Sequence, residues 1–199
     1  MPNRVLRDLL HGRGAHADPV ACVEGIPFEL AGRTLAGAPH TIWQLVWHMN
    51  YWMDYELRSL AGPEVPYPEH GEVSWPAASP PSAAAWEAEV ARFGIQVDRL
   101  VNWAAEAGLQ GLGSRVVHPR QGETGQDVLW QMVAHNSYHA GQVALLRRAF
   151  GAWPPAGGGD SGEGFGDWAI RRVGGKNRGR DPQGPRPFVH PTALPPYFS

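Results

Sequence analysis

The segment VLWQMVAHNSYHAGQVALL, residues 128–146, carries the strongest structural signal in the sequence. At about 100° per residue, an α-helix gathers one set of its side chains into a narrow stripe. Both ends of this stripe are apolar, so we expect it to face a core. Its middle holds His135 and His139, whose Cβ atoms should lie about 5–6 Å apart, close enough to share one metal ion. The stripe consists of Val128, Met132, His135, His139, Gln142 and Leu146.

A histidine pair at this spacing is not specific by itself, because such pairs often arise by chance and a buried histidine is usually only hydrogen-bonded. Two common metal-binding helix motifs are excluded. Position 136 is Asn, whereas the zincin motif needs a Glu there as general base. The helix also lacks the Glu-x-x-His pairs of a di-iron bundle.

A third histidine strengthens the metal interpretation. In HTIWQLVWHMNYWMDYEL, residues 40–57, His48 shares a helix face with Leu45, Trp52 and Tyr55. The opposite face carries polar residues, so His48 should point inward from one helix while His135 and His139 point inward from another. Three neutral imidazoles leave a coordination position for water or substrate, as catalytic metal sites do.

The remaining helices can be placed from caps and breakers. Asp18 and Pro19 are favourable start residues, but Gly25 and Pro27 should interrupt the helix that follows. Helices end at glycines and begin at Ser or Thr caps elsewhere in the chain. The pattern predicts an all-α protein, a four-helix bundle. Its expected helices span residues 5–10, 41–60, 82–107 and 125–150, in addition to the one from Asp18.

The composition changes after Trp153. Residues 154–199 contain ten glycines and eight prolines, and their apolar residues show no periodicity. We expect one domain over residues 1–153 and an extension over 154–199 that is flexible or draped on the bundle.

Composition also limits the classes of partner and location. The net charge of −2 gives no general attraction to nucleic acid or to anionic lipid. Cys22 is the single cysteine, so no intrachain disulfide can form. The N-terminus lacks the apolar core of a signal peptide, and no apolar run is long enough to cross a membrane. A cytoplasmic protein is expected.

Two stretches, PHTIWQLVWHMNYW (39–52) and LWQMVAHNSYHAGQVALLRR (129–148), resemble the DinB superfamily over roughly residues 1–153. The resemblance implies a four-helix bundle with an unusual connection, often dimeric, so a homodimer is expected. It implies a zinc or nickel site formed by His48, His135 and His139. The interrupted first helix and the extension depart from the family pattern.

Three functions compete. The first, favoured here, is a thiol-dependent S-transferase that joins a low-molecular-weight thiol to an electrophilic small molecule, and the resemblance implies such enzymes. The second is a metal-dependent hydrolase of amides or esters, which the lack of an Asp or Glu beside the histidines disfavours. The third is a metal-stabilised stress-response or interaction protein without catalysis.

Residues near His48 suggest a substrate pocket. Tyr51, Trp52 and Tyr55 lie within about one helical turn of it and could line an apolar pocket over the metal. The other histidines considered fall in loops or near helix ends and are expected to be exposed or structural; they are His16, His40, His70, His118 and His190.

Overall fold

The computed structural model describes residues 2–62, 65–116 and 123–156. Within these ranges the chain is helical, and the only β-type pairing is an isolated bridge between Arg115 and Thr124. The all-α prediction is therefore confirmed. The extension predicted over 154–199 lies outside the described residues from 157 onward. The elements are α1 (Pro2–Leu10), α2 (Pro19–Val23), α3 (Phe28–Ala31), α4 (Ile42–Leu60), η1 (Gly71–Ser74), α5 (Ala83–Gly113) and α6 (Gly125–Ala149).

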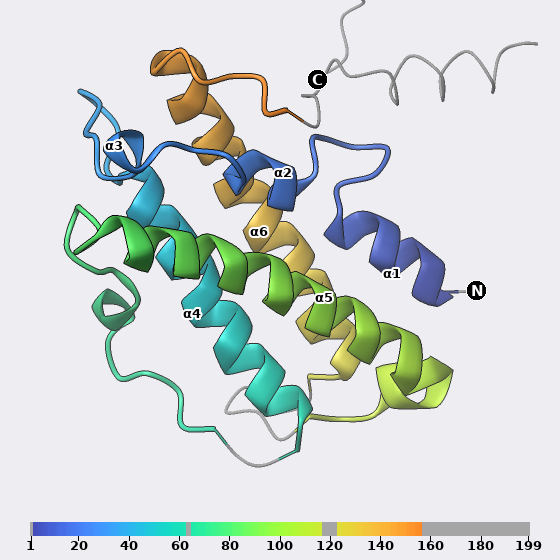
Figure 1. Ribbon diagram of the computed structural model, residues 1–199. Helices are drawn as coiled ribbons and strands as arrows, with labels where there is room; N and C mark the ends of the chain where they lie inside the picture. The colour runs from blue at the N-terminus through green and yellow to red at the C-terminus, as the bar shows by residue number, and fades with distance from the viewer. Residues whose placement is uncertain (1, 63–64, 117–122, 157–199) are drawn as a thin grey trace, which may run out of the picture.

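Three long helices, α4, α5 and α6, pack against one another in pairs (Figure 1). The short helices α1 and α2 both pack against α5 and α6, where a first long helix of a bundle would lie. The predicted interruption is confirmed, since α2 ends at Val23 and Gly25 has a φ of 67°. Gly25 thus adopts a left-handed backbone conformation that residues with a Cβ atom rarely adopt.

The starts of the main helices follow the predicted caps. The Asp18 side chain accepts a hydrogen bond from the backbone N–H of Val20, and Pro19 opens α2. Thr41 begins α4, where it forms a reciprocal capping box with Gln44. The same reciprocal bonding stabilises the first turn of α6, and it fixes where each helix begins.

The end predicted at Gly108 for the helix over 82–107 is confirmed, and a second, short helical stretch follows it within α5. Gly108 leaves the helical conformation, with φ 61° and ψ −170°, as its role as a stop signal suggested. However, the chain resumes a helical turn and ends only at Gly113. The extra turn buries Leu112, which is 2% exposed and belongs to the core. Burial of the Leu112 side chain stabilises this helical turn, which the local sequence alone does not predict.

One core extends through the three long helices. It includes Ile42 and Met49 of α4, Phe93 and Leu100 of α5, and Leu129 of α6, all fully buried. Phe93 and Leu100, two turns apart on α5, therefore face inward. This common core fixes the relative positions of α4 and α6, and those two helices carry the three histidines.

Arg147 of α6 compensates for the interruption after α2. Its guanidinium donates hydrogen bonds to the backbone carbonyls of Ala21, Cys22 and Glu24 at the end of α2, and to that of Ala152. Carbonyls at a helix end lack intrahelical partners, and a cation there is favourable. The buried arginine therefore joins α2 to α6.

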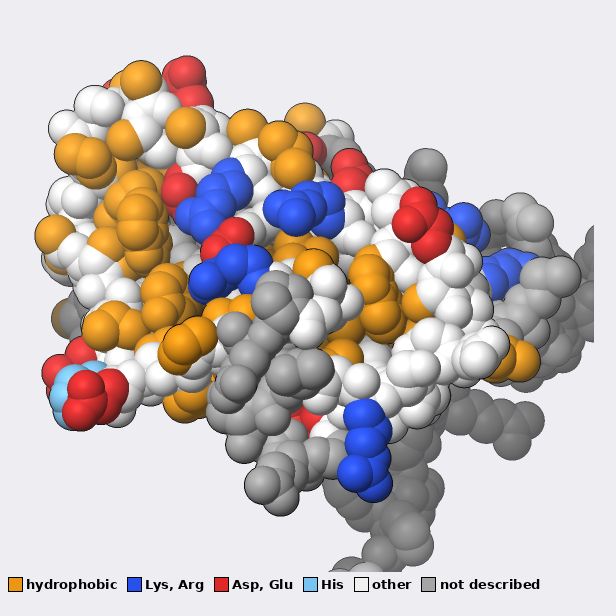
Figure 2. All heavy atoms as spheres, turned by 90° about the horizontal axis from the view of Figure 1, so that it is seen from below, with side chains coloured by type: hydrophobic (Ala, Val, Ile, Leu, Met, Phe, Trp, Pro, Cys, Tyr) orange, Lys and Arg blue, Asp and Glu red, His pale blue; other side chains and the backbone are white. Residues whose placement is uncertain are grey.

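The surface mixes the two signs of charge. In the view from below, basic and acidic side chains lie next to one another among apolar ones (Figure 2). Asp54 of α4 pairs with Arg58, four residues further along the helix, at 3.1 Å and also approaches Arg92 of α5. None of the described helices combines the length and apolar character that a membrane span requires.

Candidate metal centre

The fold brings the three predicted histidines together between α4 and α6. One ring nitrogen from each of His48, His135 and His139 lies within 4.8 Å of the others, a spacing that could hold a metal ion. His48 and His139 are each 8% exposed, so the group lies just beneath the surface. No described carboxylate or thiolate joins this group. Among the residues described, imidazoles alone therefore form the donor set.

The hydrogen bonds of His48 fix which of its nitrogens is free. The Ser74 hydroxyl donates to the carbonyl of Gly71 at 2.7 Å, so it can only accept from the imidazole. Nδ1 of His48, 2.9 Å from Ser74 Oγ, must then carry the proton. Nε2 of His48 is left unprotonated, which is the form that binds a metal ion.

The same reasoning applies to the two histidines of α6. Nδ1 of His139 lies 2.7 Å from Oε1 of Gln142, an oxygen that can only accept, so this Nδ1 carries the proton. Nδ1 of His135 lies 3.4 Å from Oδ1 of Asn136, whose amide nitrogen donates to Met53 Sδ. That contact is longer and weaker. The proton of His135 can lie on Nδ1, toward Asn136, or on Nε2, where it bonds Nε2 of His48. Nε2 of His48 and Nε2 of His139 are thus the nitrogens that hydrogen bonding leaves unprotonated.

Two ring nitrogens of the group face each other in a way that fits a bound cation. Nε2 of His48 and Nε2 of His135 are 3.2 Å apart. Because Nδ1 of His48 carries its proton, Nε2 of His48 is the acceptor and Nε2 of His135 the donor when a proton joins them. A metal ion would take the place of that proton. Nitrogens bound tetrahedrally to zinc at 2.0–2.1 Å lie about 3.3 Å apart, so the observed separation fits such an ion.

Burial and mutual repulsion keep the three rings neutral. Burial lowers the pKa of His48 to about 3, with further lowering by the neighbouring imidazoles and a smaller opposing effect of Ser74. Burial and then His139 lower the pKa of His135 to about 4. Burial also lowers the pKa of His139, although its hydrogen bond with Gln142 opposes the shift. At neutral pH no second proton on these rings competes with a metal ion for their nitrogens.

Trp75 covers one face of His48. The two rings stack in parallel at 3.8 Å between centroids, and the opposite face of Trp75 stacks on His40 at 3.7 Å. The indole is therefore held between two imidazoles. With Ser74, it immobilises His48 from a segment that contributes no ligand itself.

Ser74 and Trp75 are the site residues that sequence reasoning missed. They follow a Pro-rich stretch that the sequence presents as a long loop, and a single 3-10 turn, η1, places them against His48. Their positions show no periodicity that could be read in advance. The adjacent Ser-Trp pair at residues 74–75 is the one visible signal, and it is not specific.

The three residues predicted to line a pocket differ in how closely they contact the histidine group. Trp52 meets His48 edge-on, with 6.3 Å between ring centroids, and Tyr51 packs against Trp52. Tyr55 is 1% exposed, and its hydroxyl donates to the carbonyl of Val65, so it supports Trp52 from behind. Of the three, Trp52 is the side chain in ring contact with a candidate ligand.

The other histidines that the structure describes do not join the metal-ligating group. His16 hydrogen-bonds to Ser137 and to the carbonyl of Ala17, and His70 precedes η1 as an exposed residue. His40 contributes to the site through Trp75 rather than as a ligand. His118 and His190 lie outside the described residues.

Ser74 provides a test of this hydrogen-bonded support. We expect Ser74→Ala to weaken zinc affinity by about 10–100-fold, because Nδ1 of His48 loses the acceptor that fixes its tautomer and orientation. Competition titration with a chelator measures the change. Ser114→Ala removes a similar hydroxyl-to-carbonyl bond, to Gln110 at the end of α5, and should leave the affinity unchanged. Equal affinities of the two variants would show that Ser74 does not support the site.

The comparisons with known proteins agree with this arrangement. The family model of the DinB superfamily matches residues 14–143, which include all three histidines. The chain belongs to the DinB superfamily. No curated protein and no solved structure matches it.

Proposed function

We propose that this protein is a divalent-metal-dependent transferase that joins a small cellular thiol to an electrophilic compound. The observation that carries the proposal is a cluster of three imidazoles within reach of one ion, two of them with Nε2 left unprotonated by their hydrogen bonds, in a helical protein of the DinB superfamily. We propose His48, His135 and His139 as the ligands and zinc or nickel as the metal.

The donor set favours catalysis over a closed structural site. Three protein ligands leave a position for another molecule, whereas structural zinc sites usually have four protein ligands. A divalent ion held there would stabilise the anion of a thiol or of water, and so lower its pKa. Burial keeps the imidazoles neutral by lowering their pKa values. Hydrogen bonds orient two of them, through Ser74 for His48 and Gln142 for His139.

The surroundings favour a thiol over water as the nucleophile. Hydrolytic metal sites usually need a general base near the bound water. No described carboxylate joins the histidine group, and Asn136 occupies the position where a zincin has Glu. A thiol needs less assistance, since metal binding alone can remove its proton. We propose bacillithiol or mycothiol as the likelier donors.

The aromatic side chains at the site suit an apolar electrophile. Trp52 packs edge-on against His48, and Tyr51 lies next to it. We propose that Tyr51 and Trp52, supported by Tyr55, form the wall against which the electrophile reacts.

Cobalt substitution tests the proposal. We expect a small thiol, added to the cobalt-loaded protein, to produce a sulfur-to-metal charge-transfer band in the near ultraviolet. The His135→Ala/His139→Ala variant should show no such band. Turnover of an ester or amide without any response to thiols would establish a hydrolase instead. If neither occurs, the metal only stabilises the fold.

A further inference from the structure

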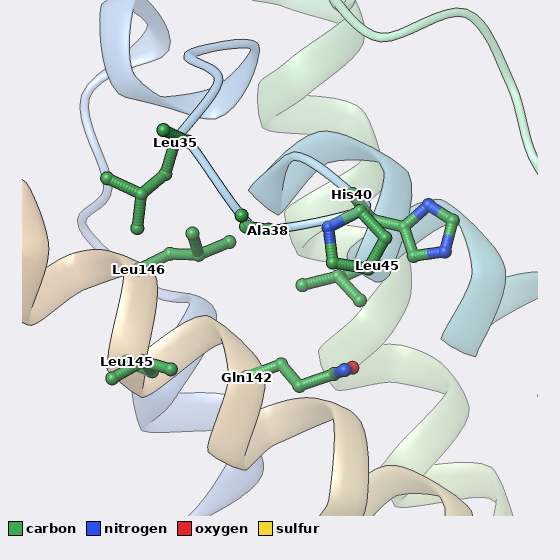
Figure 3. A pocket seen from close by; sticks show the side chains of 10 residues that line it. Leu35, Ala38, His40, Leu45, Gln142, Leu145 and Leu146 are labelled. Atoms are coloured by element: carbon green, nitrogen blue, oxygen red, sulfur yellow. The ribbon is translucent and has the colours of Figure 1, made fainter.

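An apolar cavity of about 300 Å³ lies beside the histidine group, between the segment that precedes α4 and the last turns of α6 (Figure 3). Leu35 and Ala38 border it on one side, and Leu145 and Leu146 on the other. Aliphatic side chains and backbone form most of its lining. A volume of this size suits a small organic molecule.

The cavity lies one helical turn from the metal ligands. Leu45, which lines it from α4, precedes His48 by three residues, and Gln142, which lines it from α6, follows His139 by three. Three residues of α-helix advance about 4.5 Å. A molecule in the cavity can therefore extend to the level of the candidate metal ion without leaving the α4–α6 interface.

Gln142 gives this apolar cavity a polar end. Its Oε1 atom accepts from Nδ1 of His139 at 2.7 Å, which fixes the orientation of the amide. No acceptor among the described residues bonds its amide nitrogen. In Figure 3 the Gln142 side chain extends from α6 toward α4, across the side of the cavity where His40 lies. Gln142 thus orients His139, a candidate metal ligand, through Oε1, and it offers two N–H donors through Nε2.

We propose that this cavity binds the apolar chain of a small carbonyl compound, whose carbonyl oxygen accepts a hydrogen bond from Gln142 Nε2. This rests on the proposed function, since it names the class of electrophile that would react there. A carbonyl group is an acceptor without donors, so it matches the amide N–H groups. The aliphatic lining matches an alkyl chain, which gains free energy by leaving water.

A series of 2-alkanones, from 2-butanone to 2-decanone, tests the proposal with the full-length, zinc-loaded protein labelled with ¹⁵N. We expect the side-chain amide signal of Gln142 to shift on titration. Affinity should rise about fourfold for each added methylene until the cavity is full, and then level off. An unshifted Gln142 amide, or affinity independent of chain length, would overturn the proposal.

Variants of the cavity separate this site from general apolar binding. Leu145→Trp and Ala38→Leu should each fill part of the cavity and lower 2-alkanone affinity at least tenfold. Ile95→Trp is a matched control, because Ile95 of α5 is 59% exposed and Leu145 is 62% exposed. Unchanged affinity in both cavity variants, with folding retained, would contradict the assignment.

Gln142→Glu tests the proposed hydrogen bond. This change keeps an acceptor for His139 Nδ1 but removes the amide donors, so zinc should stay bound while 2-alkanone affinity falls about three- to tenfold. Undiminished affinity would exclude Gln142 as the donor. Failure of the proposed function is a separate result: a protein that binds no zinc but still binds 2-alkanones with the expected length dependence would retain the cavity assignment alone.

Discussion

The variant His135→Ala/His139→Ala should lose stoichiometric zinc completely. It removes two of the three candidate ligands, and no described carboxylate or thiolate joins the group to replace them. A lone imidazole, that of His48, cannot compete with water and buffer for a divalent ion. Metal analysis of the tag-free protein, followed by calorimetric titration with zinc, measures the loss. Single substitutions of His48, His135 or His139 by Ala should each abolish stoichiometric binding as well.

A surface histidine serves as the control. His70→Ala removes an exposed imidazole that precedes η1 and should leave the zinc content at that of the unmodified protein. Retention of full metal by the double variant would refute the assignment of the site. A circular dichroism spectrum dominated by helix, in both variants, shows that any loss of metal is not a loss of fold.

Much of the fold could be predicted because its signals are local. Thr41 and Thr124 each satisfy the first turn of a helix through side chains three residues apart, and such caps can be read directly from the sequence. The stop at Gly108 could be read in this way too, whereas the helical turn that follows it in α5 could not. Gly108 does leave the helical conformation, but the turn beyond it is stabilised by burial of Leu112, which depends on the assembled core.

The same distinction between local signals and contacts made only in the assembled fold applies to the candidate site. His48, His135 and His139 could be selected because helical periodicity places each one on an apolar face. Ser74, Trp75 and the cavity beside Gln142 could not. They depend on how the segments before α4 and after it fold back on the long helices, and those connections carry no periodic pattern. Local rules thus selected the three candidate ligands, and Gln142 on the same stripe, but not the Ser74 and Trp75 that orient His48.

Acidification should destabilise the metal-free protein more steeply than its carboxylates alone would. Burial lowers the pKa of His48 to about 3 and that of His135 to about 4, and it also lowers the pKa of His139. In the unfolded chain an imidazole has its ordinary value of about 6.5. As the pH falls from about 6.5 toward 4, the unfolded chain takes up protons that the folded protein excludes, so the unfolded state is favoured.

The free energy of unfolding should therefore fall by up to about 1.4 kcal/mol per pH unit for each of these histidines, less to the extent that solvent screens them. Urea unfolding at pH 7 and pH 5, without metal, measures it. In His135→Leu/His139→Leu, two of the three contributions vanish, so the difference in unfolding free energy between pH 7 and pH 5 should shrink.

Zinc in excess should raise the free energy of unfolding at pH 7, by about 4 kcal/mol at a zinc concentration a thousand times the dissociation constant. This gain should decline on acidification only well below pH 6.5, because the lowered pKa values keep the ligands neutral until then. An acid dependence identical in the metal-free protein and the double variant would mean that the histidines are not held neutral by the fold.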